Sequence, residues 1–260
     1  MQKFLLDERY LDPETRAFYR EMLTSLGRSE IPFLLGGAFA LGCYTDIVRD
    51  TKDFDIFVLP EDAKRILKRL EQAGYQTEFT DPLWIAKAFH GDNVVDVIFS
   101  SGNGIGQVDQ EWFDHACEGD LLDMKAQLIP PEEMIWSKAF VMTRDRYDGA
   151  DVAHLLLGFV ERLDWQRLLR RFNVHWRVLF NHLVLFAYIY PSERARIPLW
   201  VMEDLTGRLH DETSQPAPTE RVCQGPFLSM VDYTIDVEKW GFRDPRPVKP
   251  TFRPPGPPKK

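Results

Sequence analysis

The stretch that decides the fold runs from Phe33 to Val58 and contains two short patterns, LLGG at residues 34–37 and RDTKDFDIFV at residues 49–58. An apolar run that ends in a glycine pair is typical of a strand that turns into a helix. The first backbone N–H groups of such a helix have no partner inside it and can face an anion. Gly36 and Gly37 therefore mark a candidate phosphate site, although a tight turn alone would also need them.

The second pattern predicts a strand that carries two carboxylates on one face. Side chains alternate along a strand, so Phe54 and Ile56 point one way. Asp53 and Asp55 then point the other way, with α-carbons roughly 6.5–7 Å apart by strand rise. Oxygen ligands at this spacing suit a hard cation such as Mg²⁺, which takes further ligands from water and substrate phosphates. The simpler alternative is that both acids face water at the edge of the sheet.

A third acid, Asp96, interrupts the apolar run at residues 94–99. An ionised carboxylate inside a buried strand is costly unless it is paired or holds a metal. On a neighbouring strand, Asp96 would meet Asp53 and Asp55. Three converging carboxylates repel one another until a cation binds, so we predict a metal site whose occupancy is coupled to their ionisation.

These motifs resemble the nucleotidyltransferase superfamily with a polymerase-β-like palm, and in particular the minimal and AbiEii-like nucleotidyltransferases of bacteria. The resemblance covers about residues 31–152 and includes the pattern R-x-T-x-D-F-D, which begins at Arg49 and contains Thr51. It implies an α/β (α+β) fold, in which a nucleotidyltransferase-like mixed β-sheet is flanked by helices and followed by a C-terminal helical bundle and an extended, proline-rich tail.

The resemblance also implies roles for individual residues. The catalytic residues and ligands of Mg²⁺ or Mn²⁺ would be Asp53, Asp55 and Asp96. Contacts to a nucleoside triphosphate such as ATP would come from Gly36, Gly37, Arg49, Thr51 and Lys138. The implied reaction transfers a nucleoside monophosphate to an acceptor hydroxyl and releases pyrophosphate. The acceptor stays open between a small molecule, a protein and RNA, and some relatives act in toxin–antitoxin pairs with a partner protein.

One part of the sequence departs from the family pattern. In these families a helix lysine, a basic residue and the motif D-x-x-D close the nucleotide-binding half. Lys138, Asp148 and Asp151 match, but Tyr147 stands where a lysine or arginine is common. This departure keeps a second hypothesis open, a module of the same fold that binds a nucleotide or a partner protein without catalysis. For Asp148 and Asp151, three residues apart on one helix face, an ion pair with a nearby arginine is the simpler expectation.

Composition and charge narrow the class of protein. The 260 residues are 44% hydrophobic and 13% aromatic, which is ample for a packed core and excludes disorder as a description of the whole chain. The net charge of −8 argues against a surface that binds nucleic acid throughout. The three cysteines are far apart and indicate neither disulfides nor zinc. Since no stretch is typical of a signal peptide or a membrane span, we expect a cytoplasmic protein.

Three regions are predicted along the chain. Residues 1–150 would form the catalytic domain, and residues 151–212 a domain of helices only. Residues 213–260 are rich in threonine, proline and acids, which is typical of an extended tail and would allow binding to aromatic grooves of a partner.

Three smaller features belong to the predicted site or its surroundings. The glycine-rich loop at residues 100–106 lacks the Lys-Ser/Thr of a Walker loop, so we expect a mobile loop over the site. Lys87, in the hairpin opposite Asp96, is a candidate cross-strand charge partner. Five arginines in the helical region form either a solvated face or a site for a phosphate-bearing acceptor: Arg162, Arg167, Arg170, Arg171 and Arg177.

Overall fold

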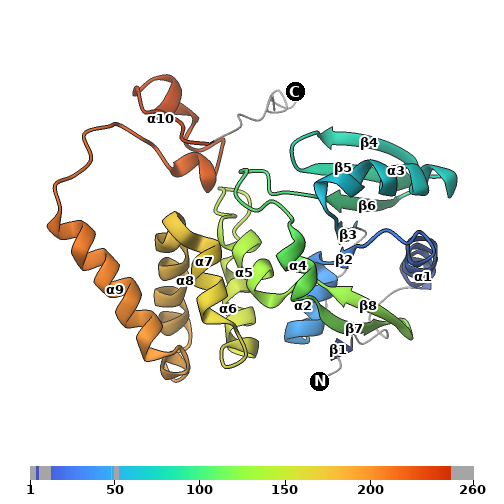
Figure 1. Cartoon of the computed structure of the whole chain (residues 1–260), viewed down its shortest axis with the longest axis horizontal. Helices are drawn as coiled ribbons and strands as arrows, with labels where there is room; N and C mark the ends of the chain where they lie inside the picture. Colours follow the sequence, from blue (N-terminus) through green and yellow to red (C-terminus); the bar gives the residue numbers. More distant parts are fainter. Residues whose placement is uncertain (1–3, 6–12, 48, 50–52, 247–260) are drawn as a thin grey trace.

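The computed structural model describes residues 4–5, 13–47, 49 and 53–246 (Figure 1). In these residues one mixed sheet of eight strands runs in the order β1-β7-β8-β2-β3-β6-β5-β4 and is flanked by helices. The α/β fold predicted from the sequence is confirmed. The strands are β1 (Phe4–Leu5), β2 (Leu34–Leu35), β3 (Asp53–Phe57), β4 (Gln76–Asp81), β5 (Ile85–His90), β6 (Asn93–Ile98), β7 (Cys117–Leu121) and β8 (Met124–Leu128).

Strand β3 lies at the centre of the sheet and shows the predicted alternation. It pairs antiparallel with β2 and parallel with β6. Phe54 and Ile56 are fully buried, whereas Asp53 is exposed and Asp55 half-buried. Burial of the alternate apolar side chains fixes the register, because a slip by one residue would turn them to the other face.

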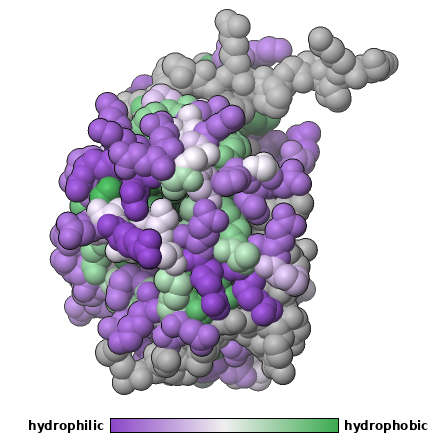
Figure 2. All heavy atoms as spheres, turned by 90° about the vertical axis from the view of Figure 1, so that its right-hand side faces the viewer, coloured by the Kyte–Doolittle hydropathy of each residue, from purple (hydrophilic) through white to green (hydrophobic). Residues whose placement is uncertain are grey.

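Five helices accompany the sheet: α1 (Pro13–Gly27), α2 (Gly37–Thr45), α3 (Ala63–Gln72), α4 (Gln110–Asp114) and α5 (Pro131–Ala139). Helix α3 buries Ile66 and Leu70 on the predicted apolar stripe and leaves Lys64 exposed. Gly74, just after its end, has a φ of +95°, which glycine adopts without strain. Seen from the right-hand side of Figure 1, the surface is mostly hydrophilic with small apolar areas (Figure 2).

The predicted helices of the next region are present as α6 (Gly149–Phe159), α7 (Trp165–Phe172), α8 (Trp176–Ile189) and α9 (Leu199–Ser214). Helix α6 packs against both α2 and α5. The rings of Tyr44 and Phe159 meet edge to face, with centroids 4.9 Å apart. One hydrophobic core therefore runs from the sheet into the helical region. The boundaries at residues 150 and 212 stay a prediction.

The chain after α9 corrects the extended tail expected from residue 213 onward. It returns towards the centre of the molecule (Figure 1) and forms the short helices η5 (Gly225–Phe227) and α10 (Thr234–Glu238). Val222 and Arg243 form a parallel bridge. Phe227 is buried, with its ring 4.7 Å from that of His175, so a small apolar cluster holds this segment in place. The proline-rich run from residue 247 lies outside the described residues.

No helix of the described residues combines the length and the apolar character that crossing a membrane requires.

Candidate active site

Strand pairing brings Asp55 and Asp96 together. They are direct neighbours in the parallel register of β3 and β6, so their side chains leave the same face of the sheet. Burial, together with the smaller effects of the charges on Asp96 and Asp53, raises the pKa of Asp55 to about 6. Asp53 begins β3 and is exposed. Asp55 and Asp96 are therefore neighbours across the two strands, and the charge of Asp53 acts on both.

Lys87 engages the third acid. It is the β5 neighbour of Asp96, and its Nζ donates to Oδ1 of Asp96 at 2.7 Å. Burial raises the pKa of Asp96, although the hydrogen bond from Lys87 opposes the shift. The predicted cross-strand charge pair is confirmed. In the part of the chain that the structure describes, no group of three His, Cys, Asp or Glu is assembled to hold a metal ion, so the metal role of these acids stays a prediction.

The glycine pair is required by the close approach of β3. Gly37 opens α2 with a φ of +55°, and a Cβ there would overlap the Asp55 carboxylate, lying 2.6 Å from its Cγ. A Cβ on Gly36 would overlap the Phe57 ring. The Gly36 N–H donates to the Asp55 carbonyl oxygen at 3.0 Å. The turn therefore needs both glycines whether or not a phosphate binds, and the start of α2 faces the carboxylate of Asp55.

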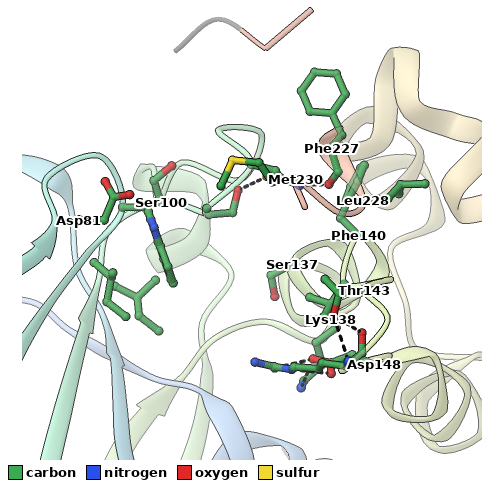
Figure 3. A pocket seen from close by; sticks show the side chains of 18 of the residues that line it. Asp81, Ser100, Ser137, Lys138, Phe140, Thr143, Asp148, Phe227, Leu228 and Met230 are labelled. Carbon is green, nitrogen blue, oxygen red and sulfur yellow. Dashed lines mark hydrogen bonds and ion pairs between the residues drawn. The ribbon is translucent and has the colours of Figure 1, made fainter. Parts of the chain in front are cut away.

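A group of basic and acidic side chains forms the side of the site that α5 contributes (Figure 3). Lys138 on α5 donates to Asp151 at 2.7 Å and contacts Asp148 at 3.3 Å. Arg146 binds Asp148 through two hydrogen bonds of 2.9 and 2.7 Å. Burial alone would raise the pKa of both aspartates. The pKa is nevertheless lowered, for Asp148 by Arg146 and Lys138 and for Asp151 by Arg49 and Lys138. The ion pair expected for Asp148 is present.

The remaining predicted nucleotide contacts differ in their placement. Arg49 donates to Asp151 at 3.0 Å and so ties the loop before β3 to α6. Thr51 lies outside the described residues. Tyr147 is exposed and stacks on His182, so it takes no part in the site. Arg146, one position earlier, supplies the basic residue whose absence at position 147 pointed away from the family pattern.

A cavity of about 500 Å³ lies between the sheet and α5 (Figure 3). Its polar part includes Gly37, Asp55, Asp96, Lys138 and Arg146. The sequence did not point to most of its other walls, which come from the β4–β5 turn, the loop after β6 and the C-terminal segment: Asp81, Trp84, Ser100, Ser101, Gly102, Asn103, Phe227, Leu228, Ser229, Met230 and Arg246. An apolar cluster, FLSM at residues 227–230, was the one available signal for the last of these walls.

The glycine-rich loop contains several hydrogen bonds, and its predicted mobility stays a prediction. Ser101 Oγ accepts from the Gly106 N–H at 2.7 Å and donates to Asn103 at 2.6 Å. Asn103 in turn donates to the carbonyl oxygen of Phe227 at 2.9 Å. The loop thus connects β6 to the C-terminal segment.

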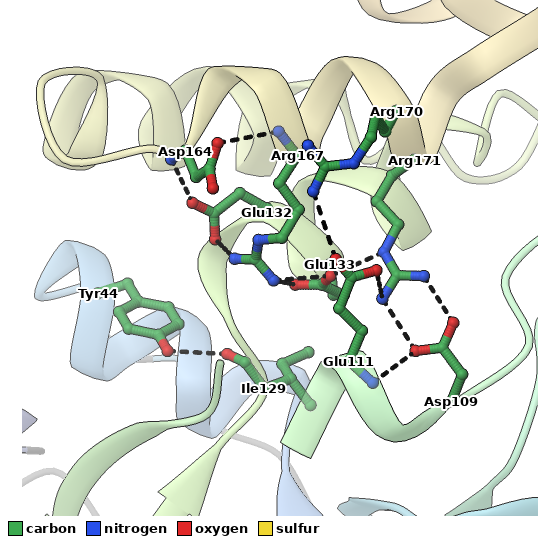
Figure 4. A network of polar contacts seen from close by, with 10 residues as sticks. All are labelled: Tyr44, Asp109, Glu111, Ile129, Glu132, Glu133, Asp164, Arg167, Arg170 and Arg171. Carbon is green, nitrogen blue, oxygen red and sulfur yellow. Dashed lines mark hydrogen bonds and ion pairs between the residues drawn. The ribbon is translucent and has the colours of Figure 1, made fainter. Parts of the chain in front are cut away.

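Three arginines of α7, namely Arg167, Arg170 and Arg171, are paired with acids within the protein (Figure 4). Arg167 is buried and donates to Glu133 at 2.9 Å and also to Glu132. Arg171 bridges Glu133 and Asp109. Both glutamates lie in the first turn of α5, where the helix dipole favours acids. These two arginines therefore fix α7 to α5 and are neither solvated nor free to bind a phosphate.

Comparison with known proteins gives a fold but no close relative. No family model and no curated protein matches the chain. The solution structure of the antibiotic-resistance factor ANT(2'')-Ia is similar, with 15% identity, a TM-score of 0.50 and coverage of 66% of this chain and 98% of that chain. Lincomycin-bound LnuA, a lincosamide antibiotic adenylyltransferase, is 16% identical, with a TM-score of 0.40 and coverage of 56% and 96%. An antigenic nucleotidyltransferase-like protein from Paracoccidioides brasiliensis is 16% identical, with a TM-score of 0.46 and coverage of 70% and 91%.

The chain has the fold of the nucleotidyltransferase superfamily. At this level of identity the likeness shows the fold alone.

Proposed function

We propose that the protein transfers a nucleoside monophosphate from a nucleoside triphosphate to the hydroxyl group of an acceptor in a metal-dependent reaction. The observation that carries the proposal is the register pair of Asp55 and Asp96 in a cavity that also contains Lys138 and Arg146. Carboxylates that could bind a cation and basic side chains that could bind a triphosphate therefore line the same cavity. Its volume of about 500 Å³ is within the range of small-molecule sites.

The acids fit a hard divalent cation. Burial and like charges raise the pKa of Asp55, so this group of carboxylates has an excess of negative charge that a cation would relieve. Oxygen donors without sulfur or imidazole suit Mg²⁺ or Mn²⁺. Asp53, Asp55 and Asp96 would hold it. When bound, such an ion would neutralise charge on the phosphate oxygens of the nucleotide.

The residues of the chain have separate tasks in the proposed reaction. Lys138 and Arg146 balance the charge of the triphosphate. The acceptor oxygen forms a new bond to the α-phosphorus, and the bond from that phosphorus to the bridging oxygen breaks. Pyrophosphate leaves with the electron pair of that bond. The hydroxyl proton passes to the Asp96 carboxylate, which acts as the general base.

Release of pyrophosphate tests the proposal. With ATP, Mg²⁺ and a panel of hydroxylated acceptors, we expect Asp55→Asn to lower turnover by about 10²-fold or more, since it removes the central carboxylate. Asp92→Asn, the same change at an exposed carboxylate of the β5–β6 turn, should leave turnover unchanged. Equal turnover in both variants would remove the basis of the proposal.

The ion pair between Lys87 and Asp96 favours a second candidate function, a module that binds a nucleotide or a partner protein without catalysis. Lys87 already supplies Asp96 with a positive charge. Titration calorimetry with ATP, with and without Mg²⁺, separates the two candidates when it is combined with the turnover assay. Binding of ATP without turnover on any acceptor supports the module, and turnover that depends on Asp55 supports the enzyme.

A further inference from the structure

We propose that the C-terminal segment, residues 225–246, forms the acceptor subsite of the cavity. It would select a compact molecule with an apolar body and a carbonyl or carboxylate oxygen, and it would discriminate against a ligand with a cation in place of that oxygen. This inference rests on the function proposed above and deepens it, because it names the class of acceptor.

The segment is anchored to both sides of the cavity. Asn103 Nδ2, from the loop after β6, donates to the carbonyl oxygen of Phe227 at 2.9 Å. On the α5 side, the Arg144 N–H donates to Asp232 at 3.1 Å, and Ser229 Oγ donates to the same carboxylate at 2.7 Å. The segment is therefore attached both to the loop after β6 and to the loop after α5, and it forms one wall of the cavity.

The wall offers an apolar surface. Phe227, Leu228 and Met230 line the cavity together with Phe140 and Trp84. In Figure 3, Phe227, Leu228 and Phe140 lie at the upper end of the right-hand wall. Lys138 and Asp148 lie at its lower end. Aromatic and thioether side chains bind flat apolar groups well. A ligand that reaches from the charged end to this wall needs an apolar body.

Arg246 adds one directional polar contact. Its side chain lines the cavity and is only 6% exposed. Asp244 accepts from Nε at 3.0 Å and from Nη2 at 2.6 Å, but Nη1 is buried and has no hydrogen-bond partner among the described residues. A buried donor without an acceptor is costly, so an oxygen of the ligand would be favourable there. Because Asp244 already balances the guanidinium, this oxygen can be a neutral carbonyl or a carboxylate.

A cation is unsuitable beside Arg246 in particular. The cavity as a whole is lined by four acids, Asp55, Asp81, Asp96 and Asp148, and by three basic residues, Lys138, Arg146 and Arg246. Asp148 is bound by Arg146 and Lys138, and Asp96 by Lys87. An ammonium group placed at Arg246 could not accept the hydrogen bond that Nη1 offers and would meet a like charge.

Three probes that differ in one group test the inference: para-(hydroxymethyl)benzoate, benzyl alcohol and para-(aminomethyl)benzyl alcohol. Their binding to the full chain is measured by NMR titration in the presence of Mg²⁺ and an ATP analogue with a methylene group between the α and β phosphorus atoms. We expect the benzoate to bind about tenfold more tightly than the amine, since one charge-assisted hydrogen bond has this magnitude.

Two variants and a control locate the effect. Phe227→Ala should weaken all three probes by about tenfold, because it removes the aromatic wall. Arg246→Met should abolish the preference for the benzoate and leave benzyl alcohol unchanged. Val231→Ala, at a position that is 65% exposed in the same segment, should bind like the wild type. Circular dichroism shows that each variant is folded, and calorimetric titration should show that the ATP analogue binds all four proteins equally.

The outcomes separate the two proposals. If the analogue does not bind the wild type in the presence of Mg²⁺, the proposed function fails and the inference fails with it. If the analogue binds but the amine probe binds most tightly, or Phe227→Ala and Arg246→Met bind all probes like the wild type, only the acceptor subsite is refuted. Loss of analogue binding in Arg246→Met alone would place this arginine at the nucleotide and would also refute the subsite.

Discussion

At the scale of single residues, the Asp55 carboxylate limits the size of the side chain at position 37 and interacts with the charges of the nearby acids. Gly37 must lack a side chain because Asp55 occupies the space where a Cβ would lie. Asp96 and Asp53 raise the pKa of Asp55, on top of the larger effect of burial. Two consequences can be measured, one steric and one electrostatic.

The steric consequence concerns Gly37→Ala. The new methyl group would overlap Asp55, and the alanine would have to keep the positive φ of Gly37. We therefore expect a loss of about 2 kcal/mol or more in the free energy of unfolding. Gly207→Ala is the matched control, because a Cβ in that position of α9 meets nothing within 4 Å. It should stabilise the protein by about 0.5–1 kcal/mol, as alanine does within a helix. Urea denaturation measures both, and equal effects would contradict the steric account.

The electrostatic consequence concerns the metal-free protein. Asp55 has a pKa near 3.8 when unfolded and about 6 when folded, so the folded state holds a proton in this interval that the unfolded chain has released. The stability that this group contributes is complete below pH 3.8 and is lost as the pH rises through about 6. Asp55→Asn should therefore be more stable than the wild type by about 1–3 kcal/mol at about pH 8, and similar at about pH 4. Urea denaturation in a chelator measures the difference, and a less stable Asp55→Asn at about pH 8 would contradict this sign.

At the scale of elements, regular patterns were predictable from the sequence and short irregular ones were not. The period of two in β3 and the apolar stripe of α3 each extend over enough residues to define a face. Helix η5 has three residues, fewer than one turn of an α-helix, so the burial of Phe227 leaves no periodic signal. The arginine-rich α7 shows a further limit: its partners Glu132 and Glu133 are more than thirty residues away, and only packing brings them together.

The contact of α5 with α7 gives a prediction for Arg167→Ala. This change leaves Glu132 and Glu133 buried without their shared guanidinium, so we expect a loss of about 3–5 kcal/mol. The loss should be larger above about pH 7, because burial raises the pKa of Glu133 to about 7 and a protonated Glu133 needs no counter-charge. Arg170→Ala on the same helix, 62% exposed, should cost less than about 1 kcal/mol. Urea denaturation at two pH values measures both, and a loss that does not depend on pH would argue against a titrating Glu133.

At the scale of the whole molecule, the sequence placed the three acids in one sheet but could not assemble the cavity around them. Its walls come from positions as far apart as Gly37 and Arg246, and no pattern within one segment reports a contact over such a distance. The predicted division at residue 150 followed the change to a purely helical pattern. The core shows no corresponding gap, since Tyr44 of α2 packs on Phe159 of α6.

This continuous core predicts a single unfolding transition. The sheet and helices α6–α8 share buried side chains, so neither part can unfold without exposing the other. Scanning calorimetry should give one peak whose calorimetric and van't Hoff enthalpies agree. Two resolved peaks would show that the helical region folds independently, as the division at residue 150 implies.

The position of the C-terminal segment also has a consequence for biosynthesis. Translation proceeds from the N-terminus, so β3 and β6 leave the ribosome long before Arg246 does. A growing chain can therefore pair its acid-bearing strands early, yet the enclosed space above them stays open until the last of its walls has emerged. Premature termination anywhere between α9 and residue 246 would release a chain that has the sheet but lacks the C-terminal wall of the cavity.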